Sequence, residues 1–537
     1  MNTKNSSRLR MQPWRVKPNG ISRRTYILSL SGFSGLIATV LILLLLWDTF
    51  SRLLVANTLF QSKSRCDILF LSSIHEIQSL RELDLSNCNL THVPATIRYA
   101  SNLFKLDLSH NPFLHTLPTE LRFCTNLDTL FVSNCIGIRD SLPSVLGKMP
   151  SITRLGWKSG SLSNLDDYPE SIPPNLIHLI LTNNKIQSIQ NIQVFKRLNK
   201  VRKLMLSHNQ LQVLNGIGVA QLQQLELLRL GGNTGLAING NSLPTELWTL
   251  PKLKWLTLPM DHETRLQVVN QSHIPTIALS QLHSLNGKHI LGNGASGKVT
   301  AYSWNGQQVA VKRIHGVTSD GTAEDELTMY AAVESIDIDH HRLVGCLALF
   351  YDGDCFHGKD DNLALLLQTT SGSDPHPSTN AKRKNPQCNK GIVMKRLPNN
   401  LIDLALPPTI NEVTRDRYEN RSFTSTFVYN VLKDIATALV YLHEYSGIAH
   451  GDLYAHNIKV DPTGRAYLLD LGASYSFSLH PQFMNEAKMF ETRAYCLLSQ
   501  ELIERVQGTT KPYSTLFTHL LDECVKPEPK ISFSTLF

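Results

Sequence analysis

The sequence predicts a multidomain fold: an N-terminal transmembrane helix, then an α/β solenoid of repeats, then an α+β domain of two lobes. Three observations lead to this prediction. An uncharged apolar run lies near the N-terminus, an apolar pattern recurs about every 24 residues, and a glycine-rich segment precedes a lysine and two aspartates. With 537 residues, 42% of them hydrophobic and 18% charged, the chain can bury several cores, so overall disorder is excluded.

The distribution of charge excludes one class of partner. The net charge is +8, but residues 1–47 hold seven Lys and Arg residues and no acid. The rest of the chain carries 45 basic and 44 acidic side chains, which leaves no positive excess for binding a nucleic acid. The nine Cys residues include no CxxC pair, so neither a disulfide-dense scaffold nor a zinc module is expected.

Residues 26–47 form the predicted membrane anchor. The run YILSLSGFSGLIATVLILLLLW contains no charge, and Tyr26 and Trp47 lie at its ends, as is typical of interfacial aromatic residues. A helix of this length spans about 33 Å, enough for a hydrocarbon core of about 30 Å. We expect a single-pass anchor behind a basic tail; a cleaved signal or transit sequence is the alternative.

A repeat array follows the anchor. Three apolar residues recur at positions i, i+3 and i+5, and an Asn or Cys often ends the copy, as in Leu103, Leu106, Leu108 and Asn111. The copies begin at Leu80, Leu103, Leu127, Ile152, Leu176, Val201, Leu225 and Leu253. This pattern resembles leucine-rich repeats, whose period is about 20–29 residues.

The repeat pattern has a direct physical meaning. The apolar residues point inward from one short strand, and stacked strands share a core. The Asn or Cys turns the chain and bonds the neighbouring backbone, so Cys88 and Cys135 are interpreted as turn residues without a disulfide. The resemblance implies that the strand face binds a protein; a passive spacer is the alternative.

The C-terminal part begins with a glycine-rich segment. Residues 290–299 read ILGNGASGKV, a GxGxxG motif that alone also fits a dinucleotide site. A dinucleotide-binding unit would continue with a helix, whereas here two strand-like runs flank a turn at Asn305-Gly306. The second run, VAVK, places Lys312 on a strand, which is the arrangement found in protein kinases.

Two downstream motifs complete this pattern. IAHGDLYAHNIKV (448–460) contains Asp452 and Asn457, and LLDLG (468–472) contains Asp470. The chain therefore resembles eukaryotic-type protein kinases over residues 280–537. Together with the repeats it resembles leucine-rich-repeat serine/threonine protein kinases, which implies a bilobal protein-kinase-like fold and ATP with Mg²⁺, or Mn²⁺, as cofactors.

The resemblance also implies the roles of individual residues. The catalytic set is Asp452 as the base, Lys312 on the α- and β-phosphates, and Glu326 as the partner of Lys312, with Glu324 as the alternative. Asn457 and Asp470 would hold the metal ion. The nucleotide site would comprise Gly292, Asn293, Gly294, Ala295, Ser296, Gly297, Val299, Ala310, Lys312, Met394 as gatekeeper and Leu397.

Departures from the kinase pattern concern the substrate side. Gly451 stands where an Arg is usual, Leu471 replaces a Phe, and Tyr454 and His456 occupy positions where other kinases carry Lys or Arg. Residues 491–506 resemble a buried helix that normally follows a longer activation segment, so substrate docking is in doubt. Residues 354–390 are expected to be a surface insertion between two strands.

These inferences give one expected organisation. It comprises a basic tail (1–25), the transmembrane helix (26–47), a linker and repeat cap (48–78), leucine-rich repeats (79–262), a linker (263–284) and the kinase domain (285–537). We expect transfer of the ATP γ-phosphoryl group to Ser/Thr hydroxyls of a protein substrate, with an unknown protein ligand on the repeats. A pseudokinase scaffold is the alternative.

Two arguments about the side of the membrane on which residues 48–537 lie oppose each other. Four basic residues just before the span and one soon after it place residues 48–537 away from the cytoplasm. An ATP site, however, needs nucleotide, which the cytoplasm supplies. We therefore predict the cytoplasmic side, against the charge bias.

Overall fold

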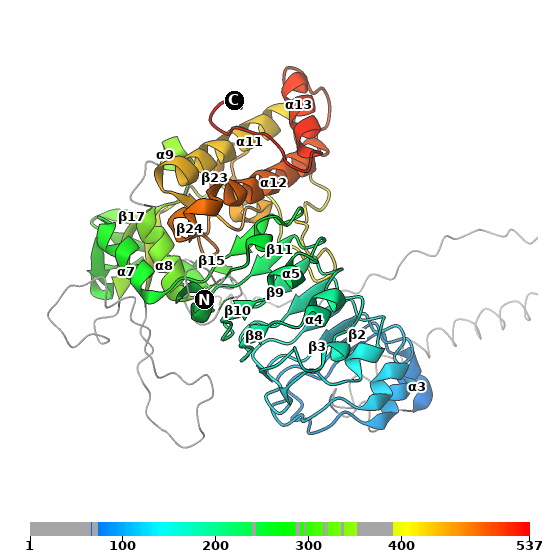
Figure 1. Cartoon of the computed structure of the whole chain (residues 1–537). Coiled ribbons are helices and arrows are strands. Elements are labelled where there is room, and N and C mark those ends of the chain that lie inside the picture. Colours follow the sequence, from blue (N-terminus) through cyan, green and yellow to red (C-terminus); the bar gives the residue numbers. More distant parts are fainter. Residues whose placement is uncertain are drawn as a thin grey trace, which may run out of the picture. The chain divides into compact units, whose positions relative to one another are not determined.

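The computed structural model describes Cys66, Thr318 and residues 73–238, 243–285, 290–294, 297–314, 321–333, 338–351 and 390–537 (Figure 1). The anchor predicted at residues 26–47 lies outside these residues. Among the helices of the described residues, none is both long enough and apolar enough to span a bilayer.

Eight parallel strands form the sheet of the repeat array, in chain order along its length (Figure 1). They are β1 (Glu82–Asp84), β2 (Lys105–Asp107), β3 (Thr129–Phe131), β5 (Arg154–Gly156), β7 (His178–Ile180), β9 (Lys203–Met205), β11 (Leu227–Arg229) and β12 (Trp255–Thr257). Each strand begins two residues after the first apolar residue of its predicted copy. The leucine at the middle of each strand is buried, as in Leu106, Leu130 and Leu228. The prediction of a leucine-rich solenoid is confirmed.

Short helices and ladders connect the strands. Pro94, Pro118 and Pro244 directly precede short 3-10 helices, because proline has the fixed φ of a helix start and no N–H to satisfy. The connecting helices are α3 (Ile74–Ser79), η2 (Ala95–Tyr99), η3 (Thr119–Phe123), η4 (Leu146–Lys148), η5 (Pro169–Ser171), α4 (Ile192–Arg197), α5 (Gly216–Val219), α6 (Thr234–Ile238) and η6 (Thr245–Leu247). The ladders pair β4 (Arg139–Asp140) with β6 (Ser161–Leu162), and β8 (Ser188–Ile189) with β10 (Val213–Leu214).

The Asn and Cys residues tie adjacent repeats together, with one exception. Asn111 Nδ2 donates to the Leu85 carbonyl at 3.0 Å, and the Cys135 thiol donates to the Leu108 carbonyl at 3.1 Å. Cys88 instead forms a disulfide with Cys66, so the interpretation of Cys88 as a simple turn residue is wrong. The reason is its place in the first repeat: within the described residues β1 is the edge strand of the sheet, so no earlier strand there offers Cys88 a carbonyl.

The smaller lobe of the C-terminal domain is built on one sheet, with strand order β13-β18-β19-β17-β16-β14 and β15 paired to β16. Its strands are β13 (Thr276–Ala278), β14 (His283–Ser284), β15 (Ile290–Gly294), β16 (Gly297–Trp304), β17 (Gln307–Ile314), β18 (Cys346–Tyr351) and β19 (Lys390–Lys395). Its helices are α7 (His262–Gln271), η7 (Leu279–Gln281), α8 (Ala323–Ala332) and α9 (Ile338–His341). The insertion predicted at 354–390 lies between β18 and β19, which pair with each other; residues 352–389 are outside the described part.

Residues 263–284, expected to be a linker, are part of this lobe. The Asp261 side chain caps α7 by accepting the Thr264 N–H at 2.7 Å. Strand β13 then joins the sheet beside β18, and Ile277 is buried between them and the rest of the lobe. The segment lacks a strong period in sequence because its elements are short, but each is fixed by a cap or a strand partner.

The larger lobe is mainly helical, and α12 departs from the expectation. A helix was expected from Glu491, but α12 begins at Met484, so Glu491 lies buried inside it. A disulfide joins Cys496 of α12 to Cys524 of α13. The elements are β20 (Ile402–Asp403), α11 (Ser425–Val440), the π-turn η9 (Tyr441–Tyr445), β21 (Ile448–Ala449), η10 (Ala455–Asn457), β22 (Ile458–Val460), β23 (Ala466–Leu468), β24 (Tyr475–Ser476), η11 (Phe477–Leu479), η12 (Pro481–Phe483), α12 (Met484–Ile503) and α13 (Ser514–Cys524).

The hydrophobic cores of the repeats and of the larger lobe are continuous. Leu256 and Leu258 of the last repeat belong to the same buried cluster as Phe477 and Phe490 of the larger lobe. Trp248 stacks on Phe490, with ring centroids 6.0 Å apart and planes 4° apart. Residues 65–537 accordingly form one compact unit.

Candidate active site

Lys312 is the centre of a buried charge cluster. It lies in β17, and its Nζ is 2.5 Å from Glu326 Oε1 of α8 and 3.1 Å from Asp470 Oδ1. Burial alone would lower the pKa of Lys312, but the two carboxylates outweigh it and hold that pKa above its usual range, so the ammonium stays charged. Glu324, the alternative partner, forms an ion pair with Lys390 instead.

The first turn of helix α8 is fixed by a capping box and by an ion pair with helix α7. Thr322 and Asp325 form a capping box, in which each side chain bonds the other's backbone N–H. The buried guanidinium of Arg265 in α7 is 2.8 Å from Asp325 Oδ1. This arrangement points Glu326 at Lys312.

The glycine-rich segment forms the turn between β15 and β16, where Gly294 lies opposite Gly297. Gly297 has φ +156°, and a Cβ there would lie 2.0 Å from the Arg313 carbonyl, so only glycine fits. Ala295 and Ser296, predicted as nucleotide ligands, lie outside the described residues.

Four residues predicted for the nucleotide site belong to one apolar cluster. Ala310 of β17 lies opposite Met394 of β19, and both are buried. Val299 and Leu397 pack against the same cluster and are partly exposed. An aromatic base would meet an apolar surface here, next to the Lys312 charge cluster.

Asp452 and Asn457 follow β21 and are hydrogen-bonded to each other. Asn457 Nδ2 donates to the Asp452 carbonyl at 2.9 Å and to its carboxylate Oδ2 at 2.8 Å. His450 Nε2 donates to the Leu469 carbonyl at 2.9 Å, and its Nδ1 accepts the Asp452 N–H at 3.3 Å. These bonds tie the loop to the segment that carries Asp470.

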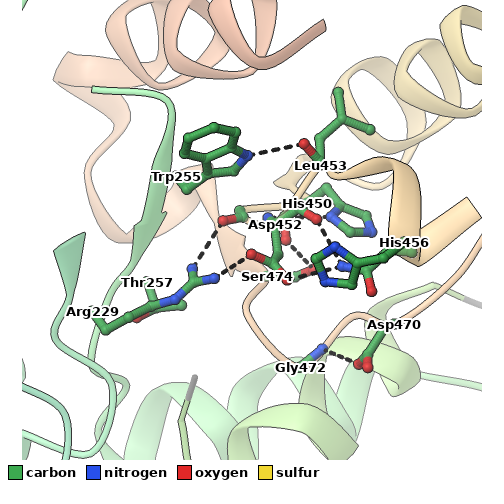
Figure 2. A network of polar contacts seen from close by, with 12 residues as sticks. Arg229, Trp255, Thr257, His450, Asp452, Leu453, His456, Asp470, Gly472 and Ser474 are labelled. Atoms are coloured by element: carbon green, nitrogen blue, oxygen red, sulfur yellow. Dashed lines mark hydrogen bonds and ion pairs between the residues drawn. The ribbon is translucent and has the colours of Figure 1, made fainter. Parts of the chain in front are cut away.

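Asp470 has a left-handed backbone, φ +65°, stabilised by the Gly472 N–H, which donates to its Oδ1 at 3.1 Å (Figure 2). Burial would raise the pKa of both Asp452 and Asp470. Arg229 outweighs this at Asp452, and Lys312 outweighs it at Asp470, so both pKa values lie below their usual range and both groups are carboxylates at neutral pH.

The side-chain oxygens of Asp470 and Asn457 fit a hard divalent cation if further oxygens complete the site. The Asp470 carboxylate and the Asn457 amide are ligand types that Mg²⁺ prefers. In the described part of the chain, however, no group of three or more His, Cys, Asp or Glu side chains could form a metal cage. A cation would therefore need additional oxygens from a nucleotide phosphate, which is usual for Mg²⁺.

Arg229 and Trp255 of the last two repeats contact the loop 450–457, which the sequence did not predict (Figure 2). The Arg229 guanidinium forms an ion pair with Asp452 Oδ1 and donates through Nη1 to the Gly451 carbonyl at 3.0 Å. Trp255 Nε1 donates to the Leu453 carbonyl at 2.9 Å. The only signal in the sequence is that both residues occupy strand positions between inward leucines, which the repeat pattern does not restrict.

Gly451 is explained by this contact. Its φ is +73°, and a Cβ there would lie 2.3 Å from the Ala473 carbonyl and 2.7 Å from the Leu256 carbonyl of β12. Its N–H donates at 2.8 Å to Glu491, which also bonds His443 at 2.6 Å. The backbone of the last repeat therefore passes where the side chain of an arginine at position 451 would be.

Comparison with known families agrees with this geometry. The family Protein tyrosine and serine/threonine kinase matches residues 285–512, and two leucine-rich repeat families match residues 174–234, 79–99 and 102–124. The chain thus carries leucine-rich repeats and a protein kinase domain, as predicted. Such a domain generally implies ATP binding and use of a divalent metal.

Three relatives illustrate the two parts. Cysteine-rich receptor-like protein kinase 14 of Arabidopsis thaliana is 25% identical over 42% of this chain and 27% of its own length. Receptor-like protein 9b of the same plant is 33% identical over 26% of this chain and 16% of its own. A probable serine/threonine-protein kinase of fowlpox virus is 34% identical over 14% of this chain and 27% of its own. The chain thus spans about a quarter or less of these relatives' length.

Proposed function

From a chain that combines leucine-rich repeats with a protein kinase domain, we infer an ATP-dependent protein kinase that phosphorylates Ser/Thr hydroxyls. One observation carries this proposal. Lys312 is buried and lies within ion-pair distance of Glu326 and Asp470, Asn457 bonds Asp452, and the pKa values of Asp452 and Asp470 lie below their usual range. A scaffold without catalysis would have no need to keep five such groups aligned.

The residues divide the reaction between them. Lys312 would orient the α- and β-phosphates, and the backbone of Gly292–Gly297 would cover them. Asp452 would orient the substrate hydroxyl and accept its proton as the oxygen bonds the γ-phosphorus and the bond to the β–γ bridging oxygen breaks. A bound Mg²⁺ would neutralise charge on the phosphates; Asn457 and Asp470 would hold it.

Two variants of the full chain test this proposal. Asp452→Asn should abolish phosphoryl transfer to a generic protein substrate and leave Mg·ATP affinity nearly unchanged, because the base contacts the hydroxyl and not the nucleotide. Asp470→Asn should weaken Mg·ATP binding as well. Transfer of labelled phosphate and nucleotide affinity are measured side by side. If the wild-type chain transfers no phosphate with either Mg²⁺ or Mn²⁺ yet is folded, the pseudokinase alternative is correct.

The first repeats are the proposed site for a protein ligand. Strand-face positions of the later repeats are buried against the kinase domain, as at Arg229 and Trp255. Glu82 and Asp84 of β1 are exposed, and Lys105 of β2 is partly exposed. A ligand on the repeats would thus engage the N-terminal strands, and reversal of the charges there should abolish its binding without changing transfer to a generic substrate.

Two disulfides change our proposal for the side of the membrane. Disulfides persist in oxidising compartments and are rare in the cytosol, so Cys66–Cys88 and Cys496–Cys524 agree with the charge bias around residues 26–47. The names of two relatives describe receptor-like proteins, which supports the anchor. We therefore propose that residues 48–537 lie outside the cytoplasm, in a compartment that supplies ATP.

A glycosylation assay tests this orientation. The triplets that begin at Asn89, Asn270 and Asn420 are N-glycosylation acceptors in a eukaryotic secretory compartment, and all three asparagines are exposed. A glycosidase-sensitive mass shift is expected, and it should be lost when all three asparagines are replaced by Gln. Digestion of the kinase domain by protease added to the cytoplasmic side of sealed membranes would contradict it.

A further inference from the structure

The catalytic loop carries no lysine or arginine of its own. Residues 450–457 read HGDLYAHN, and Tyr454 takes the position where a lysine is expected from the resemblance. Tyr454 is buried and stacks on Trp255 of β12, with ring centroids 4.1 Å apart and planes 9° apart. This side chain therefore serves the contact with the repeats and brings no positive charge to Asp452.

A cation reaches Asp452 from the repeats instead. Arg229, the last residue of β11, is only 2% exposed, and the Asp452 side chain is 18% exposed. The Arg229 guanidinium donates to two groups of the catalytic loop at once, the Asp452 carboxylate and the Gly451 carbonyl. A planar guanidinium with two fixed partners defines direction as well as charge.

The Asp452 carboxylate is thus oriented through both of its oxygens. Arg229 bonds Oδ1 and Asn457 bonds Oδ2. A carboxylate has about four acceptor positions, so these two bonds leave capacity for a substrate hydroxyl. Phosphoryl transfer depends mainly on positioning and on fixed charge, so a base held at both oxygens meets the main requirement.

We propose that Arg229 is a positioning residue for phosphoryl transfer, and that the last two leucine-rich repeats complete the active site of the kinase domain. This inference rests on the proposed function. According to this proposal the repeats support catalysis in addition to binding a ligand. The neighbouring strand β12 also limits position 451, since the Leu256 carbonyl together with the Ala473 carbonyl leaves no space for a side chain there.

A removable inhibitor is the competing explanation of the same contact, and the packing argues against it. Leu227 and Trp255 of the repeats share one buried cluster with Leu453 and Ala455 of the loop. Separation of the two parts would expose this cluster, which is costly. The rest of the site is already assembled in its presence, because Lys312 is paired with both Glu326 and Asp470.

The test compares Arg229→Met and Arg229→Lys in the full chain. Arg229→Met should lower kcat about 10- to 100-fold, because small displacements of a reacting group have effects of this size, and should change the KM for ATP less than about twofold. Arg229→Lys keeps the charge but not the two-pronged geometry, so it should recover part of kcat.

The comparison of kcat with KM distinguishes positioning from a structural role. A structural defect in this region would weaken Mg·ATP binding together with kcat, whereas loss of positioning lowers kcat and leaves the KM for ATP near its wild-type value. Partial recovery of kcat in Arg229→Lys would also indicate that the charge beside Asp452 is used.

Arg154→Met is the matched control. Arg154 is also a strand-face arginine that contacts the kinase domain, through the Ile410 carbonyl at 2.7 Å, but it lies away from the catalytic loop. Its kcat should stay near the wild-type value. A rise or no change of kcat in Arg229→Met, or an equal fall of kcat in Arg154→Met, would overturn the proposal.

A thermal-unfolding cycle gives a readout that needs no activity. The fall in Tm caused by Arg229→Met should be smaller in the Asp452→Asn background, because the ion pair is already weakened there. If the two falls are equal, the ion pair does not form and the inference is wrong. If the cycle shows coupling but the wild-type chain transfers no phosphate, the proposed function has failed, and the contact is only structural.

Discussion

Substitution of Trp255 by alanine tests whether the repeats and the kinase domain form one unit in solution. The indole is 1% exposed, donates to the Leu453 carbonyl at 2.9 Å and stacks on Tyr454. It belongs to the repeats, yet both of these partners belong to the catalytic loop. Its energetic contribution therefore reports directly on the contact between the two parts.

The expected loss of stability can be worked out from these contacts. Truncation of a buried tryptophan to alanine costs about 3–5 kcal/mol, which includes about 1 kcal/mol for the hydrogen bond and about 0.5–1.5 kcal/mol for the stacked ring. Trp255→Phe keeps a stacked ring and loses the hydrogen bond, so about 1–2 kcal/mol is expected. Tyr168→Ala, at a side chain that is 54% exposed, should change stability by less than about 0.5 kcal/mol.

Urea unfolding of the full chain, followed by circular dichroism, measures these differences. Activity should fall with Trp255→Ala, because the loop that carries Asp452 loses one of its supports. A loss below about 1 kcal/mol in Trp255→Ala, with Trp255→Phe equal to wild type, would mean that the repeats do not rest on the catalytic loop, and the argument for Arg229 would fail with it.

Three further predictions follow from the same contacts. Gly451→Ala should lower the free energy of unfolding by about 2–4 kcal/mol and remove most of the activity, because the added Cβ meets two carbonyls. The control is Gly508→Ala, at a similar φ of +88° with open space around it. In the same urea assay it should show only the cost of a positive φ at a residue with a Cβ. Burial raises the pKa of Glu226, but Lys254 and two arginines outweigh it and lower that pKa to about 2. The ionised carboxylate therefore stabilises the fold fully above its ordinary pKa of 4.5, and this stabilisation is lost as the pH falls towards 2. Urea unfolding at several pH values should show that the free energy of unfolding of Glu226→Gln falls less steeply with acid than that of the wild type. Alkylation of the denatured, unreduced chain should leave Cys66 and Cys88 unlabelled in peptide masses and label Cys124, and labelling of all three would contradict the disulfide.

Several features of this protein were determined by the sequence alone. Each of the eight repeat strands begins two residues after the first apolar residue of its predicted copy. The pattern is this regular because the inward leucines must recur once per turn of the solenoid to fill one core. Lys312, Asp452, Asn457 and Asp470 come together because their spacing fixes which strand or loop carries each. Glu326, which the sequence favoured over Glu324 because it precedes an apolar stripe, lies 2.5 Å from Lys312, and the capping box at Thr322 fixes the start of its helix.

Other features were decided by the tertiary structure. The segment 263–284 reads as a linker, and only its partners β18 and α8 make it part of the lobe. Cys88 follows the repeat pattern, and only its place at the sheet edge allows a bond to Cys66. Arg229 and Trp255 occupy positions that the repeat leaves open to any residue, so no local pattern could link them to Asp452, more than 190 residues later. In the sequence Gly451 is only a departure from the kinase pattern. The structure explains it by a backbone φ of +73° and by the close approach of two carbonyls, those of Ala473 and of the distant Leu256.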